Sequence, residues 1–410
     1  MPCLPRHGRQ ASPLRGLFHG ILVAWFTPLA SFGIAVTRHP PDRRRVWRWN
    51  AFVALFLCAC STPFILSAEE SDAPGASAVE AAPLFHDVHF HLLNYVQHGI
   101  TAKQYFGIVG DRVGRVAMFG IPLQQKWDYF ISGDRAPNYY LLSDAALYYY
   151  SFVDAVIAME YRSLDEAHKA RVDPMITGFN PTDMYAADHI RRVLLTFPGV
   201  FSGIGEFSVH KEFVSSKIAG HAASLRNPAL DRILEAVAEI GLVAILHCDI
   251  DTVRAGERPT HYANLLRVLA AHPGASVIWA HTGLGRFVGP ADEHVALLGE
   301  MLDDPGYDHV VMDISWDEVA KYVVATPDTA DVWAALLEKH PTRFLFGTDS
   351  VAPLNWDRYA KTYGDYGPLW QRLSAETRAQ VERLNYERVF DAAIPKVRAW
   401  ERDQLAAASP

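Results

Sequence analysis

The chain has 410 residues, and half of them are hydrophobic, so it can bury the core of a large domain. The formal net charge is −8, but residues 1–68 hold eight arginines and one acid, a net of +7, which leaves −8 − 7 = −15 for the remainder. An acidic body disfavours nucleic acid as the main partner, because phosphate binding depends on clustered lysine and arginine. No Gly/Ser-rich linker interrupts the chain after residue 85, which predicts one catalytic domain over residues 83–405.

Residues 1–82 have the composition of a targeting segment. Positions 43–48 hold four arginines, residues 51–66 are apolar, and the small residues 67–68 offer a cleavage site. A basic, then apolar, then small-residue order is typical of a secretory signal. Residues 69–82 are small and acidic, as in a flexible linker. We therefore expect an exported, periplasmic protein whose domain follows an N-terminal extension, a signal and a linker.

Two other interpretations of this segment stay open. Residues 57–60 (Leu-Cys-Ala-Cys) resemble a lipobox, so the chain could instead be a membrane-anchored lipoprotein with its lipid anchor at Cys60. A second apolar stretch at residues 17–36 allows both stretches to be read as membrane spans. That reading is disfavoured, because residues 51–66 are short for a span and the earlier stretch contains a proline.

From residue 84 onward, strand-like apolar runs alternate with helical patterns. Helices are predicted after Asn227-Pro228 and over residues 262–271 and 332–339, and the aromatic stretch 141–171 predicts a long buried helix with an extension. Eight alternating strands favour a parallel α/β sheet and, at this length, a (β/α)8 TIM-type barrel with insertions. A doubly wound open sheet is the alternative, but no Gly-rich phosphate loop follows the first strand. The strands are predicted at residues 84–90, 115–119, 175–179, 200–207, 242–247, 276–281, 309–314 and 344–348.

A His-x-His pair, His89 and His91, ends the first predicted strand. Side chains alternate along a strand, so Asp87, His89 and His91 should share the inward face of the barrel, while His86 is interpreted as a surface or loop residue. Two imidazoles near one strand end can converge on a cation, and neutral imidazole suits zinc. Asp87 is predicted to lie one layer deeper and to orient one of the histidines.

Four later strands also end in an acidic or histidine residue, namely Glu206, His247, His281 and Asp349. A barrel enzyme builds its site from the ends of several strands, so these side chains should meet the histidine pair. A carboxylate such as Glu206 can bridge two cations. Asp349 can take a proton from a metal-activated water and pass it to a leaving group.

These six residues, in this order and on strands one, four, five, six and eight, resemble the amidohydrolase superfamily of metal-dependent hydrolases. The closing sequence Asn-Tyr-Glu-Arg-Val-Phe at residues 385–390 is similar to an element that ends its amidohydrolase-related branch. The resemblance implies one metal held by His89, His91 and Asp349, and a second held by His247 and His281. It also implies that Glu206 takes the bridging place of a carboxylated lysine, as in TatD-type deoxyribonucleases. One or two Zn²⁺ ions are expected, with Mn²⁺ or Fe²⁺ as alternatives.

Residues just past the strand ends should shape the substrate pocket. Lys211 and Arg286 could hold an anionic group, and Asp313 at the end of strand seven should face inward as a supporting residue. The predicted substrate-binding residues are Asn94, Tyr95, Lys211, Arg286 and Trp316, with His210, Asp249 and Lys321 as further candidates.

The sequence therefore predicts a hydrolase that uses a metal-activated water, with Asp349 and Glu206 as catalytic residues, on a C–N or C–O bond of a small carbonyl substrate (an amide, ester or lactone). A single-zinc non-oxidative decarboxylase of the same superfamily is the first alternative. A non-catalytic exported metal-binding protein is the second. The expected partner is a small-molecule substrate, not nucleic acid, and a homo-oligomer is compatible with the sequence.

Overall fold

The computed structural model describes residues 82–252 and 259–408. The predicted signal segment, its cleavage point and the lipid-anchor position Cys60 lie outside the described residues. Within the described part of the chain, no helix is both long enough and apolar enough to cross a membrane.

The central sheet is parallel and closes on itself. Its strand order is β10-β9-β8-β7-β6-β5-β2-β1-β11, and the two outermost strands, β10 and β11, follow each other in the chain. They are two parts of one interrupted strand that pairs with β9 on one side and with β1 on the other. The prediction of eight strand positions in a barrel is thus confirmed. The strands are β1 Phe85–His91, β2 Val113–Phe119, β5 Val172–Ile176, β6 Gly203–Val209, β7 Val243–Cys248, β8 Ser276–Trp279, β9 Val310–Asp313, β10 Phe344–Leu345 and β11 Ser350–Val351.

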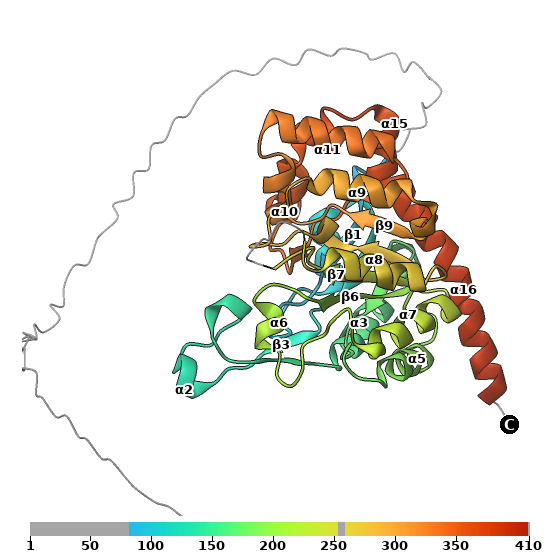
Figure 1. Cartoon of the computed structure of the whole chain (residues 1–410). Helices are drawn as coiled ribbons and strands as arrows, with labels where there is room; N and C mark the ends of the chain where they lie inside the picture. The colour runs from blue at the N-terminus through green and yellow to red at the C-terminus, as the bar shows by residue number, and fades with distance from the viewer. Residues whose placement is uncertain (1–81, 253–258, 409–410) are drawn as a thin grey trace, which may run out of the picture. The chain divides into compact units, whose positions relative to one another are not determined.

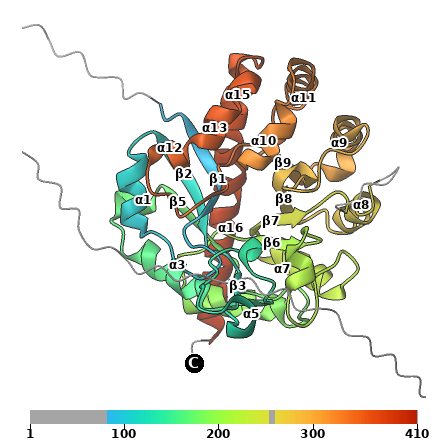
Figure 2. The same cartoon turned by 90° about the vertical axis from the view of Figure 1, so that its left-hand side faces the viewer.

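Helices surround the strands (Figure 2). The local sequence explains their limits: α7 starts where the Asn227 side chain accepts a hydrogen bond from the Ala229 N–H and ends at Gly241 in the left-handed conformation. The larger helices are α1 Ala102–Val109, α3 Val153–Arg162, α5 Ala186–Thr196, α7 Pro228–Ile240, α8 Tyr262–Ala271, α9 His294–Asp303, α10 Asp317–Val323 and α11 Pro327–Lys339. The shorter ones are α4 Glu166–Lys169, α6 Val214–Lys217, α12 Trp356–Tyr359, α13 Lys361–Asp365, α14 Gly367–Trp370 and α15 Ala375–Ala379.

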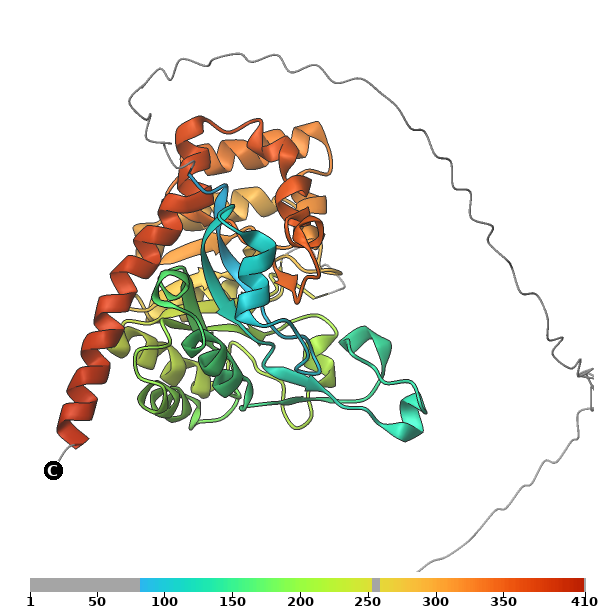
Figure 3. The same ribbon diagram turned by 180° about the vertical axis from the view of Figure 1, so that it is seen from behind.

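The last helix, α16 Asn385–Ala408, crosses the end of the barrel at which the strands begin (Figures 1 and 3). Its residues Tyr386, Val389 and Phe390 are buried and pack against the barrel interior, including Val88 and Ile278. The closing sequence element therefore covers one end of the barrel, and the other end, where the strands finish, carries the predicted ligands.

The prediction of a buried helix over residues 141–171 is wrong for its first part. Residues 123–149 instead form an arm that projects from the barrel (Figures 1 and 3). Tyr148 lies in an antiparallel strand pair and is 42% exposed. Aromatic residues favour extended backbone, so their presence in this stretch did not distinguish a strand from a buried helix. The arm consists of β3 Leu123–Gln125, α2 Tyr129–Ser132, the 3-10 turn η1 Tyr140–Leu142 and β4 Leu147–Tyr149.

Candidate metal centre

The six predicted ligands come together at the end of the barrel where the strands finish. His89 and His91 lie at the end of β1 and His247 lies near the end of β7, and all three are almost fully buried. Glu206 lies in β6, and Asp349 lies between β10 and β11. His281 lies just past β8, in the turn η2 Ala280–Gly283, so the predicted strand was two residues too long.

The carboxylate of Asp349 and that of Glu206 face the histidine pair from two sides. Asp349 Oδ1 lies 3.1 Å from His91 Nε2 and 3.6 Å from His89 Nε2. Glu206 Oε2 lies 3.5 Å from His91 Nε2 and 3.7 Å from His89 Nε2. Glu206 Oε1 lies 2.5 Å from His247 Nδ1 and 3.9 Å from His281 Nε2. Four imidazole rings therefore direct a nitrogen towards the Glu206 carboxylate.

Two of these imidazole nitrogens fit a metal better than a hydrogen bond. His89 Nε2 and His281 Nε2 are buried, and among the described residues they have no hydrogen-bond partner. An unpaired buried nitrogen costs free energy, which a cation bound there would recover. Among the described residues, three ligand groups have their donor atoms close enough for one ion. Two of them contain His89, one with His91 and Asp349 and the other with Glu206 and His281, and the third consists of Glu212, His247 and Asp249. The residues present therefore fit one or two divalent cations.

Hydrogen bonds on the far side of each ring orient the histidines. His91 Nδ1 donates to the Gly120 carbonyl at 3.2 Å, and His89 Nδ1 lies 2.7 Å from Asp313 Oδ2. Ser315 Oγ donates to the same Asp313 oxygen and lies 2.9 Å from His281 Nδ1. These contacts leave Nε2 of each ring directed inward, as metal-binding histidines require. The prediction that Asp313 faces inward and supports the site is confirmed.

The His247 ring has the opposite orientation, with Nδ1 rather than Nε2 directed at the site. Its Nε2 lies 2.9 Å from Asp249 Oδ1, while its Nδ1 faces Glu206. Burial, followed by the nearby Lys211 ammonium, lowers the pKa of His247 to about 4, so the ring is neutral near pH 7. Asp249, one of the predicted pocket residues, therefore lies behind a candidate ligand rather than in the pocket.

Charges around the carboxylates keep them ionised. Burial alone would raise the pKa of Asp349, but His89 and His91 lower it to about 2. Burial likewise opposes ionisation of Glu206, yet the Lys211 ammonium, 2.9 Å from its Oε1, and His247 hold its pKa well below the usual value. Both groups are thus carboxylates near neutral pH, which is the form that binds a cation.

Asp87 does not orient a histidine ring. Its carboxylate accepts hydrogen bonds from Tyr359 Oη and from the Thr348 hydroxyl and N–H, as well as from the His89 N–H. Shifts in the pairing of β1 with β2, between Phe85 and Asp87 and between Asp87 and Phe90, break the regular alternation. Asp87 therefore lies towards α12 and fixes the segment that carries Asp349.

A cavity of about 230 Å³ opens above these ligands. Of the predicted pocket residues, Tyr95, Lys211, Arg286 and Trp316 line it. Tyr139 and Tyr140, which lie on the arm, also line it and were not predicted. Their position past the second strand, in a loop at the open end of the barrel, is the signal that could have identified them. The remaining lining residues are His91, Ile121, Pro122, Leu123, Glu206, Ser208, Val214, Asp349 and Val351.

The structure does not bring three of the predicted pocket residues to this cavity. The side chain of Asn94 accepts hydrogen bonds from the backbone N–H groups of Val96 and His98 and shapes its own loop. His210 stacks on His261 with ring centroids 4.0 Å apart. Lys321 is exposed and pairs with Glu318.

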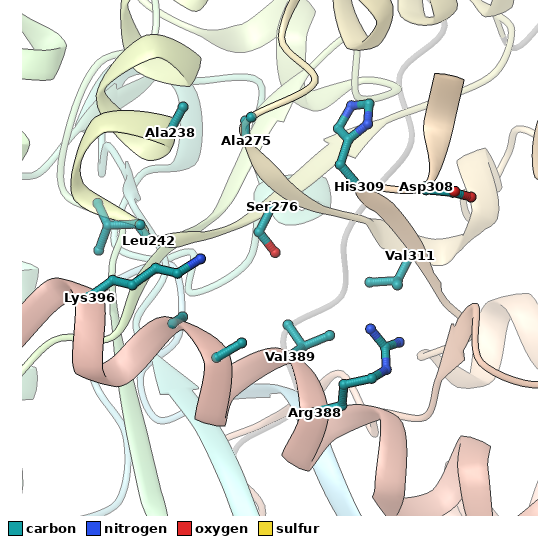
Figure 4. A pocket seen from close by; sticks show the side chains of 14 residues that line it. Ala238, Leu242, Ala275, Ser276, Asp308, His309, Val311, Arg388, Val389 and Lys396 are labelled. Atoms are coloured by element: carbon teal, nitrogen blue, oxygen red, sulfur yellow. The ribbon is translucent and has the colours of Figure 1, made fainter. Parts of the chain in front are cut away.

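A second cavity, of about 260 Å³, lies at the opposite end of the barrel beside α16 (Figure 4). Lys396 and Arg388 line it, together with Ser276 and His309. Arg388 donates to the Thr342 carbonyl, just past the end of α11. The side chain of Lys396 lies against Gly241 at the end of α7. A backbone hydrogen bond of Arg388 and the packing of the Lys396 alkyl chain account for these contacts.

The comparisons with known proteins identify the family of the chain. The family model described as amidohydrolase matches residues 86–392, which is three quarters of the chain. The chain therefore belongs to the amidohydrolase family, as the six-residue pattern predicted. The specific likeness of Glu206 to TatD-type enzymes stays a prediction.

Several solved structures are similar to the chain at low sequence identity. One is a dihydroorotase from Campylobacter jejuni, with 15% identity, a TM-score of 0.43, and coverage of 75% of this chain and 83% of that chain. Another is an amidohydrolase with bound zinc from Burkholderia multivorans, with 14% identity, a TM-score of 0.41, and coverage of 75% and 99%. A third is an amidohydrolase from Bifidobacterium longum subsp. infantis, with 16% identity, a TM-score of 0.39, and coverage of 75% and 98%. No curated protein sequence matches the chain.

Proposed function

We propose that this protein is a metal-dependent hydrolase that cleaves a C–N or C–O bond of a small carbonyl substrate. The observation that carries the proposal is the pair of buried, unpartnered nitrogens, His89 Nε2 and His281 Nε2, directed at two ionised carboxylates. When bound by these ligands, a divalent cation such as Zn²⁺ would lower the pKa of a water and polarise the carbonyl of the substrate.

The side chains of the chain would supply the proton transfers. Asp349 is a carboxylate at the edge of the cavity, so it can accept a proton from the attacking water and return it to the leaving nitrogen or oxygen. Glu206 and Lys211 form an ion pair that also lines the cavity. The Lys211 ammonium lies 5.8 Å from the centroid of the Trp316 ring, in position to hold the substrate oxygen or an anionic substituent.

The charges that line the cavity favour an anionic substrate. Among the side chains that line the cavity, Lys211 and Arg286 are positively charged, and Glu206 and Asp349 are negatively charged. Arg286 also forms an ion pair with Glu318, which is not among the lining residues, so a divalent cation would leave these five side chains and the ion with a net charge of +1. Among the described residues, Arg286 Nε is buried without a hydrogen-bond partner, and the guanidinium lies 5.5 Å from the Trp316 ring centroid. We infer that the substrate places a carboxylate near Arg286.

Replacement of Arg286 by methionine (Arg286→Met) should therefore weaken binding of carboxylated substrates selectively. Loss of a charge-assisted hydrogen bond predicts a rise in KM of about 10-fold to 100-fold. The corresponding methyl ester, which lacks the charge, should show little change. Steady-state kinetics on both substrates measure this difference, with Arg232→Met, at a half-exposed position in α7, as the matched control. Equal losses for the charged and the neutral substrate would exclude Arg286 as the carboxylate partner.

The pairing of Glu206 with two neighbouring side chains favours the decarboxylase as the second candidate function. Glu206 is already paired with Lys211 and His247, so His89, His91 and Asp349 can form a complete one-cation set without it. A single zinc ion per chain would accord with the decarboxylase, whereas two would accord with a hydrolase in which Glu206 bridges.

Metal analysis combined with a substrate panel tests both candidates. We expect the purified full chain to contain one or two divalent cations per chain, to lose activity on chelation and to regain it with Zn²⁺. The panel should contain amides, esters and lactones, and a parallel assay should follow CO₂ release from aromatic carboxylates. A chain that binds no divalent cation would remove both proposals. Metal-dependent CO₂ release without hydrolysis would replace the first proposal by the second.

A further inference from the structure

The outer face of the arm, residues 123–149, is apolar and exposed. Phe130 is 98% exposed, and its neighbours Trp127, Tyr129 and Ile131 are 54%, 64% and 51% exposed. No residue of α2, which carries three of these side chains, is buried. A contiguous apolar surface of this kind on a folded domain usually marks a site that another molecule covers.

The inner face of the arm packs against other residues of the same chain. Leu123, Tyr140 and Leu147 form a small buried cluster with Tyr95 and Val214. The Lys217 ammonium donates to the carbonyls of Tyr140 and Ser143 and fixes the return of the arm to the barrel. The arm is therefore held in place along one side, and only its outer side lacks a partner among the described residues.

The charge distribution favours a second copy of this chain over a membrane as the partner. The tip of the arm, residues 126–135, holds Lys126 and Arg135 and two aspartates, a net charge of zero. A two-fold interface brings a surface against itself, so a balanced patch can pair with its copy, whereas a patch of one sign would repel it. An anionic membrane would instead be repelled by the −15 charge of residues 69–410 and would meet only two basic residues on the tip.

The base of the arm offers a cavity with a mixed lining, in which apolar residues alternate with polar ones such as Gln124 and Asn138. This cavity has a volume of about 610 Å³, with Val96, Trp127, Pro137 and Tyr148 among its lining residues. The projecting side chain Phe130 and this cavity lie on the same arm. Two arms that pack antiparallel about a two-fold axis can therefore exchange both contacts at once.

We propose that two copies of this chain form a two-fold dimer through the outer faces of their arms, with Phe130 of each copy entering the cavity at the base of the other arm. The proposal does not depend on the reaction that the barrel catalyses. It links assembly to the site, because Tyr139 and Tyr140, which line the substrate cavity, belong to the same arm. Dimerisation would hold this wall of the cavity in one position.

Sedimentation velocity over a dilution series tests the proposal on the full chain and its variants, all in the same non-ionic detergent because residues 51–66 are apolar. The wild type should be dimeric at micromolar concentrations. Phe130→Asp should raise the dimer dissociation constant by about 30-fold or more, as expected for a central aromatic contact, and Ile131→Asp should act in the same direction. Met159→Asp is the matched control, because Met159 is 65% exposed on α3, outside the arm.

Each other outcome overturns the proposal. A monomeric wild type, or a dimer that persists in Phe130→Asp, would exclude the arm as a dimer interface. Vesicles of phosphatidylethanolamine and phosphatidylglycerol test the membrane as the occupant. A monomeric chain that co-sediments with these vesicles, in which Phe130→Asp alone reduces co-sedimentation, would assign the arm to a membrane. Thermal melting of each variant checks the fold, and because Phe130 is exposed, the melting temperature of the monomer should not fall.

Discussion

Asp349→Asn is expected to lower kcat by about 10²-fold to 10⁴-fold, the contribution typical of a general acid–base residue. Asparagine has nearly the same shape and keeps an oxygen that can bind a cation, but it cannot accept the proton of the attacking water. Asp349 is held near the histidines by its backbone N–H, which donates to the His89 carbonyl at 2.8 Å, so the substituted side chain should stay in place.

The pH profile distinguishes this role from a general loss of structure. Because His89 and His91 lower the pKa of Asp349 to about 2, the native group is ionised throughout the range from pH 5 to pH 9. The variant should therefore lose activity by a similar factor at every pH in that range, not only on one limb of the profile. Hydrolysis rates and metal content measured on the same samples check both points.

Asp357→Asn provides the control, since Asp357 is an exposed carboxylate in α12, eight positions further along the chain. It should leave kcat unchanged. If Asp349→Asn kept full activity, the proton-transfer role of Asp349 would be excluded. If it lost its metal as well as its activity, Asp349 would act chiefly as a ligand.

The sequence was sufficient to predict which side chains meet at the site, because the meeting follows from topology. Once eight strands run parallel in a closed barrel, residues at their carboxyl ends must converge, whatever the loops do. Glu206 and His247 are 41 positions apart in the chain, yet they lie on neighbouring strands and are in contact. The same topology placed Asp313 correctly, because β9 keeps a regular register with β8.

The failed prediction for Asp87 has one cause, which is that regular alternation was assumed where the backbone departs from it. The irregular pairing of β1 turns Asp87 away from the position that alternation assigns to it. His86 was interpreted as a surface or loop residue, but it is buried and lies between Arg115 and Glu387. Local sequence contains no signal for such a shift, since it depends on how the neighbouring strand packs.

The arm shows a second limit of the sequence. Tyr148 and its aromatic neighbours were assigned to a buried helix because large apolar side chains are usually inside. The structure exposes many of them, and a single chain gives no partner that would bury them. The rule describes the average burial of aromatic residues, and the exposed aromatic side chains of the arm depart from it.

His89→Ala is expected to have the largest effect on metal binding, because His89 belongs to two of the three ligand groups. A cation in either of the two groups that contain His89 should lose a ligand. Loss of a residue that only supports a ligand typically lowers metal affinity by about 10-fold to 100-fold, so loss of a ligand itself should exceed about 100-fold. Titration against a competing chelator measures the affinity, and elemental analysis of the dialysed chain measures the stoichiometry.

His86→Ala is the matched control for this prediction, since His86 is a buried histidine on the same strand. It contacts Glu387 and the Arg115 N–H rather than the metal centre, so its loss should lower the free energy of unfolding by about 1–3 kcal/mol and leave the metal content unchanged. Thermal melting of the two variants separates destabilisation from loss of a ligand. Since a merely structural role would affect both variants alike, metal retention by His89→Ala equal to that of His86→Ala would exclude His89 as a ligand and with it the two candidate cation positions that contain it.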